Sequence, residues 1–156
     1  MDLSPKHARA LGRLTAHWAY FESELESLLG ILLRDHAGLS SVILRSFNGA
    51  STKIDLLVRV NKARNNPYQA QINETLQEAA RLNSERDKHV HGLWQIEAES
   101  KGKLTRLSGH KKSAWYPNAK AFSAKEIQSD VEAIAELSLR LYDLEAELAA
   151  AFSKHQ

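Results

Sequence analysis

The chain has 156 residues, a length that is typical of one domain and sufficient to bury a core without disulfides or metal ions. Hydrophobic residues make up 43% of it and charged residues 26%, with only 7 Gly and 3 Pro, which excludes a disordered or fibrous chain. The absence of Cys excludes disulfide scaffolds, iron–sulfur clusters, Cys-ligated zinc sites and thiol nucleophiles. We expect a single domain over residues 1–156.

The first predicted helix covers residues 5–36. Ser4 and Pro5 supply an N-cap and a first-turn proline, and Gly38 stands just past the expected end. Apolar residues alternate at spacings of three and four, which is typical of the buried face of a packed helix: Leu11, Leu14, Trp18, Phe21, Leu25, Leu28 and Leu32. We expect Trp18 and Phe21 to lie in the core or in a contact between subunits, and not in a ligand cage.

The same spacing predicts further helices over residues 39–47, 51–64 and 67–91. A long last helix begins at a capping box made by Ser123 and Glu126. Its apolar face comprises Ile127, Val131, Ile134, Leu137, Leu141, Leu144 and Leu148. The predicted fold is therefore mainly α: an antiparallel helical bundle with a short basic β-hairpin or loop insertion before the last helix.

The predicted insertion follows Gly92, where the period of the apolar residues changes to that of two short strands. Residues 101–125 contain seven Lys or Arg and no acid, together with aromatic residues. Such a segment can neutralise phosphates and stack bases of single-stranded RNA, or it can be a soluble hairpin whose aromatic rings pack on the bundle. The candidate RNA-binding residues are Lys101, Lys103, Arg106, Lys111, Lys112, Trp115 and Tyr116.

Candidate chemistry lies near the end of the helix over residues 67–91. Its apolar stripe consists of Ile72, Leu76, Ala79 and Val90, with Asn83 among them, and it places Arg86 about 40° to one side and Asp87 about 60° to the other. Buried charges are costly unless paired, so these groups should face a cleft, an interface or each other. Asp87 and His91 are four residues apart and share one flank, whereas we expect His89 to face solvent.

Residues 85–94, Glu-Arg-Asp-Lys-His-Val-His-Gly-Leu-Trp, resemble the signature of the HEPN superfamily. On this match Arg86 is the family arginine, Asp87 replaces the commoner Asn, and His91 is the histidine at spacing R-x4-H. The resemblance implies a helical homodimer and a metal-independent endoribonuclease whose site combines the motif of both subunits. It also implies a catalytic set of Arg86, His91 and Asp87, although Asp87 adds a negative charge beside a phosphate.

The function expected from this resemblance is cleavage of single-stranded RNA to 2′,3′-cyclic phosphate ends, without metal or other cofactor. The expected partners are RNA, a second copy of the chain and, where the protein acts as a toxin or defence effector, a cognate antitoxin protein. The alternative is a non-catalytic dimeric helical adaptor that uses the same polar cluster for assembly or partner docking.

Other chemistries find no support in the sequence. A zinc site built from His89, His91 and His110 is geometrically poor, because residues two apart on a helix point in very different directions. No P-loop, nucleophile elbow, zincin or dinucleotide motif is present. No stretch approaches the ~20 apolar residues of a membrane span, and the first residues lack a signal-peptide core, so we expect a cytoplasmic protein with no membrane partner.

Overall fold

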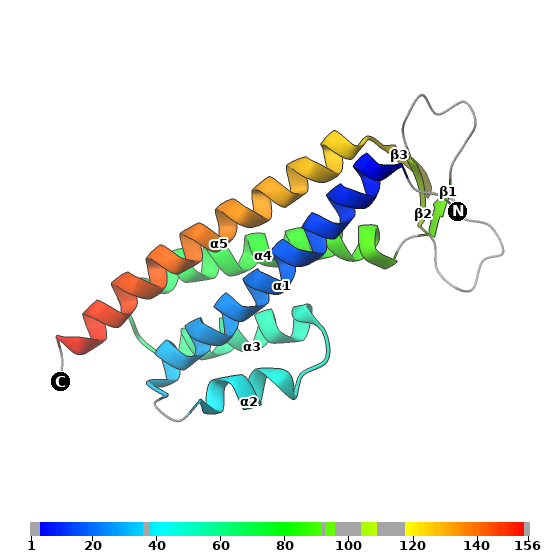
Figure 1. The fold of residues 1–156 in the computed structure, drawn as a ribbon. Coiled ribbons are helices and arrows are strands. Elements are labelled where there is room, and N and C mark those ends of the chain that lie inside the picture. The colour runs from blue at the N-terminus through cyan, green and yellow to red at the C-terminus, as the bar shows by residue number, and fades with distance from the viewer. Residues whose placement is uncertain (1–3, 36–37, 92, 96–103, 109–117, 155–156) are drawn as a thin grey trace.

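The fold is a helical bundle with a small sheet at one end (Figure 1). The structure is a computed structural model that describes residues 4–35, 38–91, 93–95, 104–108 and 118–154. The helices are α1 (Pro5–Leu33), α2 (Leu39–Arg45), α3 (Ala50–Ala63), α4 (Gln69–His91) and α5 (Ala124–Ser153). The strands are β1 (Leu93–Gln95), β2 (Leu104–Ser108) and β3 (Asn118–Phe122). The mainly helical fold class predicted from the sequence is confirmed.

Helix α1 begins where the sequence predicted and ends earlier. The Ser4 side chain accepts a hydrogen bond from the backbone of His7, and Pro5 occupies the first turn. The helix ends at Leu33 because Arg34 adopts a left-handed conformation with a φ of 53°, and its N–H closes the last turn on Gly30 and Ile31. The predicted end near residue 36, with Gly38 just beyond it, was therefore wrong by about one turn.

The helices alternate in direction along the chain, which makes α1 and α5 parallel. His7 of α1 lies against the end of β3, just before α5 begins, and farther along Ser27 donates to Glu145 at 2.7 Å. The two helices run side by side in the same direction over most of their length (Figure 1). Consecutive helices are antiparallel, as the sequence analysis expected, whereas α1 and α5 are parallel because both occupy odd places in an up-and-down order of five helices.

The core is formed by the apolar faces of α1 and α5 together with residues of α3 and α4. Leu14, Trp18, Phe21, Leu25, Leu28 and Leu32 of α1 are buried, as are all seven apolar residues predicted for α5. Leu11 is half-buried at the edge of this core. The predicted placement of Trp18 and Phe21 in the core is confirmed. None of the helices in the described part of the chain is long and apolar enough to cross a membrane.

The sheet between α4 and α5 has three antiparallel strands in the order β1-β2-β3. Leu93 is paired with Leu107, and Leu104 with Phe122. The sequence predicted two strands in this segment and did not predict β3. Phe122 fastens the sheet to the bundle, because its carbonyl lies 3.3 Å from Nε2 of His7 and its ring meets the edge of the buried His89 ring.

Candidate functional site

The polar residues near the end of α4 are held by a short hydrogen-bond network. The Asn83 amide donates to the Ser51 hydroxyl of α3 at 3.0 Å and to the Asp87 carboxylate at 3.4 Å. Arg86 in turn donates to Asp87 through Nη1 at 2.7 Å. The sequence predicted that the two charges would face a cleft, an interface or each other, and the structure pairs them directly.

Arg86 is anchored between the core and an open hollow. Its side chain is only 20% exposed, and its guanidinium carbon lies 5.9 Å from the centre of the Trp18 ring. Its Nε atom is buried and lacks a hydrogen-bond partner among the described residues. Trp18 is fixed through its indole N–H, which donates to Glu22 at 2.9 Å. The Arg86 guanidinium is thus pre-positioned with spare donor capacity.

The hollow beside Arg86 has a volume of about 280 Å³ and is shared by three helices. Most of the residues that line it have polar side chains: Thr15, Trp18, Ala19, Glu22, Ser23, Glu26, Arg45 and Arg86. Sequence reasoning placed Trp18 in the core without connecting it to Arg86, and it missed the other residues from α1 and α2, because these lie outside the apolar face of α1 and share no motif. We name this set the Arg86 hollow.

The charges in and around the Arg86 hollow are balanced. Lys53 pairs with Glu22 at 2.8 Å, and Arg45 lies 3.6 Å from Glu26. With the Arg86–Asp87 pair, three cations face three carboxylates. An anionic ligand would therefore have to exchange one of these carboxylate contacts for its own. Asp87, which is 45% exposed, is the carboxylate that solvent reaches most easily around Arg86.

The two histidines of the motif lie on different sides of α4. His91, the last residue of the helix, is exposed. It is five residues beyond Arg86, which places it about 140° around the helix and about 7.5 Å along it. No hydrogen bond joins Asp87 and His91 within the described part of the chain, where the partners of Asp87 are Arg86 and Asn83. The structure therefore brings Arg86 and Asp87 together and leaves His91 apart.

His89 is buried, contrary to the expectation that it would face solvent. Its ring is only 1% exposed, and Nε2 lies 3.0 Å from the Asp130 carboxylate of α5. Val90, which the sequence placed in the apolar stripe, is instead exposed. Helix α3 begins at Ala50, beside Asn83, and no longer covers α4 beyond that level. The buried face of the last turns therefore rotates toward α5.

The predicted RNA-binding residues fall mostly outside the part of the chain that the structure describes. The ranges that it does not describe contain Lys101, Lys103, Lys111, Lys112, Trp115 and Tyr116, and also His110. Arg106 is on β2, where it is paired with Trp94 on β1 and with Lys120 on β3. Lys120 is exposed, and its ammonium lies 4.7 Å from the centre of the Phe122 ring.

Comparisons with other proteins leave the family of this chain open. Among the described residues, no group of three or more His, Asp or Glu side chains is arranged to hold a metal ion. No family model, curated protein or solved structure matches the chain. The functional assignment therefore depends on the chemistry of the residues themselves.

Proposed function

We propose that the protein is a metal-independent endoribonuclease of the HEPN type that acts on single-stranded RNA at the end of α4. The observation that carries the proposal is the state of Arg86: its side chain is four-fifths buried, its guanidinium is held near the Trp18 ring, and the residue lines an open hollow. A planar guanidinium with free donors is suited to phosphate oxygens. His91 supplies an exposed imidazole on the last turn of the same helix.

Cleavage needs three things from these residues. A base must take the proton of the RNA 2′-hydroxyl, an acid must protonate the leaving 5′-oxygen, and positive charge must stabilise the crowded phosphorus oxygens. Arg86 would stabilise the phosphate oxygens. One His91 would carry both proton transfers in turn, or two His91 side chains from two copies would share them. Because Arg86 and His91 are about 140° apart, the RNA has to lie across the helix end.

Asp87 limits this chemistry in its present position. Its carboxylate accepts a hydrogen bond from Nη1 of Arg86. The phosphate therefore has to displace this carboxylate or bind to the remaining guanidinium nitrogens. Once released from Arg86, Asp87 lies four residues before His91, within reach of its imidazole. The same carboxylate would then orient the histidine. Asp87→Asn should therefore strengthen phosphate binding, because it removes a competing negative charge.

The test is incubation of the purified protein with total RNA in the presence of EDTA. The proposal predicts fragments with 2′,3′-cyclic phosphate ends and a loss of at least about 100-fold in cleavage rate for each single variant. This is the scale of a lost general base for His91→Ala and of a lost donor to the phosphate oxygens for Arg86→Ala. Arg81→Ala is the matched control, because Arg81 is an exposed cation on the same helix that pairs with Glu78. Undiminished cleavage by the Arg86→Ala, His91→Ala double variant would refute the proposal.

The basic segment between α4 and α5 is proposed as an RNA contact surface of the same enzyme. Its cations would neutralise phosphates, so RNA binding should weaken steeply as salt rises and weaken further when Lys111 and Lys112 are replaced by Ala. RNA binding that changes neither with salt concentration nor on these replacements would refute the proposal that this segment contacts RNA. A cognate antitoxin protein, where one exists, would act by covering the same surface.

A second candidate function is favoured by the carboxylates around Arg86. Because Glu22, Glu26 and Asp87 balance the cations of the Arg86 hollow, a polar protein surface fits it without the charge exchange that a phosphate requires. On this reading the protein is a helical adaptor whose Arg86 cluster fastens two subunits. Dissociation of a dimer on Arg86→Ala would support the adaptor, whereas a dimer that survives this change argues against it.

A further inference from the structure

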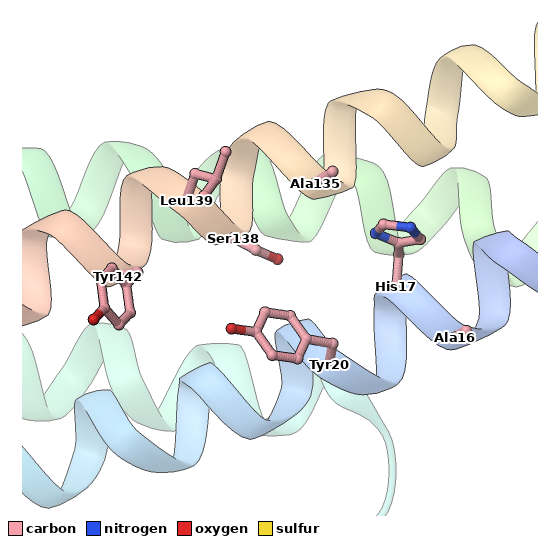
Figure 2. A pocket seen from close by; sticks show the side chains of 7 residues that line it. All are labelled: Ala16, His17, Tyr20, Ala135, Ser138, Leu139 and Tyr142. Atoms are coloured by element: carbon pink, nitrogen blue, oxygen red, sulfur yellow. The ribbon is translucent and has the colours of Figure 1, made fainter.

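A second hollow of the molecule lies between α1 and α5, on the side away from α4 (Figure 2). It has a volume of about 570 Å³, and two small residues, Ala16 and Ala135, are among those that line it. The side chains of His17, Tyr20, Ser138, Leu139 and Tyr142 border it. We name it the α1–α5 groove. It shares no residue with the Arg86 hollow.

Large apolar side chains project from the rims of the α1–α5 groove. Tyr20 is 56% exposed, Leu139 67% and Tyr142 60%. Together they are half of the large hydrophobic residues that the described part of the chain leaves exposed. Monomeric proteins rarely leave such side chains gathered beside a hollow of matching polarity, and such clusters mark interaction surfaces. The same surface thus carries both protruding side chains and a cavity that could receive them.

The charges beside the groove are arranged in a complementary way. Arg13, Tyr20 and Glu24 lie within about 40° of one another on α1, so all three share the face that borders the groove. Arg13 is exposed and forms no ion pair with the described residues. The Glu24 carboxylate is near the Tyr20 hydroxyl, and its interaction with the phenol raises the pKa of Tyr20. An exposed cation therefore lies toward one end of the groove and a carboxylate toward the other, both on α1.

We propose that the α1–α5 groove is the contact surface for a second copy of this chain, which packs antiparallel across a two-fold axis. A two-fold contact uses the same patch on both copies, so the patch must complement itself. An axis midway between Arg13 and Glu24 places each Arg13 opposite the Glu24 of the other copy. Tyr20, Leu139 and Tyr142 of each copy then fill the space above Ala16 and Ala135 of the other.

The position of the axis agrees with the lengths of the two helices. The level midway between Arg13 and Glu24 is also the midpoint of α1, and the groove residues of α5 lie at the midpoint of α5. An antiparallel copy would therefore cover both helices from end to end. A face about 44 Å long and roughly 20 Å wide is comparable to the ~800 Å² per partner that stable interfaces bury.

This dimer leaves the two α4 ends far apart. The end of α4, the start of α1 and the sheet lie at one end of the bundle (Figure 1). An antiparallel arrangement places these ends at opposite ends of the dimer, and the Arg86 hollow faces away from the groove. Two His91 side chains therefore do not meet across this interface. The inference does not depend on the proposed ribonuclease activity, and Arg86→Ala should leave this dimer intact.

The test uses charge reversal at the two positions and sedimentation velocity across protein concentration. R13E alone and E24R alone each place like charges opposite one another at both symmetric contacts, so each should weaken dimerisation about tenfold. An equimolar mixture of R13E and E24R should form heterodimers as tightly as the unmodified chain dimerises, because both contacts then join opposite charges. Arg13 is exposed, whereas Glu24 is half-buried and its charge acts on the buried Glu145 carboxyl, so the stability of the E24R chain is measured by urea denaturation before its dimerisation is compared.

Apolar substitutions provide the second arm. Leu139→Glu should abolish dimerisation, whereas Val42→Glu should not, because Val42 is an equally exposed apolar residue on α2, outside the groove. A chain that is monomeric at all concentrations, a dimer unaffected by Leu139→Glu, or a mixture of R13E and E24R that stays monomeric would each overturn the proposal. Circular dichroism of every variant separates a lost contact from a lost fold.

Discussion

Glu145 of α5 allows a sharp test of the packing between α1 and α5. Its side chain is buried, one carboxylate oxygen accepts from Ser27 at 2.7 Å, and the other has no hydrogen-bond partner among the described residues. Burial raises the pKa of this carboxyl to about 7, and the charge of Glu24 acts in the same direction against the Ser27 hydrogen bond. The ionised form of Glu145 therefore destabilises the fold.

Glu145→Gln should stabilise the protein at pH 8. The amide keeps the shape of the side chain and can still accept from Ser27, but it carries no charge. Raising the pKa of a carboxyl from 4.5 to about 7 corresponds to about 3 kcal/mol once the group is ionised in both states. Residual solvation reduces this to roughly 2 to 3 kcal/mol, or an increase in Tm of roughly 5 to 10 °C for a chain of this length.

The difference should depend on pH in one direction only. Between about pH 4.5 and 7 the folded chain holds the Glu145 proton that the unfolded chain has lost, so the unmodified protein loses stability as pH rises through this window. Below it, Glu145→Gln and the unmodified chain should be equally stable. Urea denaturation from pH 4.5 to 9, at concentrations below dimer formation, measures this, with the exposed Glu147→Gln as control. A gap that is constant with pH, or a variant destabilised at pH 8, would refute the reasoning.

Three further changes test individual contacts by urea denaturation at pH 7. Ser123→Ala removes the hydroxyl that accepts from the backbone of Glu126 and should cost about 1 kcal/mol. Leu141→Ala opens a cavity in the fully buried seam of α5 and should cost about 2 to 5 kcal/mol. His89→Ala leaves the Asp130 carboxylate without this partner and Phe122 without its ring contact, and should cost about 2 to 3 kcal/mol; an unchanged midpoint would show that His89 is not structural.

The features that could be predicted from the sequence are those set by local chemistry. The apolar spacing of α1 and α5 reflects one buried face on a helix with 3.6 residues per turn, and all seven α5 residues are buried as predicted. The capping box of Ser123 and Glu126 depends on residues only three apart. The end of α1 was misplaced because a helix is usually expected to end just before a Gly, and Gly38 is the first Gly after the apolar spacing stops. In the structure Arg34 adopts the left-handed conformation that is usual for Gly at this position.

The features that could not be predicted depend on what covers each helix. Periodicity placed His89 and His91 at similar angles from the apolar stripe. Helix α3 begins beside Asn83 and does not cover the last turns of α4, so these turns pack on α5 and bury His89. The pairing of Arg86 with its neighbour Asp87 also depends on tertiary structure, because residues adjacent on a helix do not normally face each other. Trp18 and Asn83 hold the two groups in that position.

Helix α1 contributes residues to both proposed surfaces, the α1–α5 groove and the Arg86 hollow, from different sides of the helix. Its buried seam, centred near Trp18 and Phe21, divides the rest of the helix into two exposed flanks. Tyr20 on one flank borders the α1–α5 groove, and Glu22 on the other lines the Arg86 hollow, with the two residues about 160° apart around the helix. A second copy on the groove therefore leaves the hollow open to its own ligand. Dimerisation and RNA cleavage should be separable, with Leu139→Glu removing the first and His91→Ala the second.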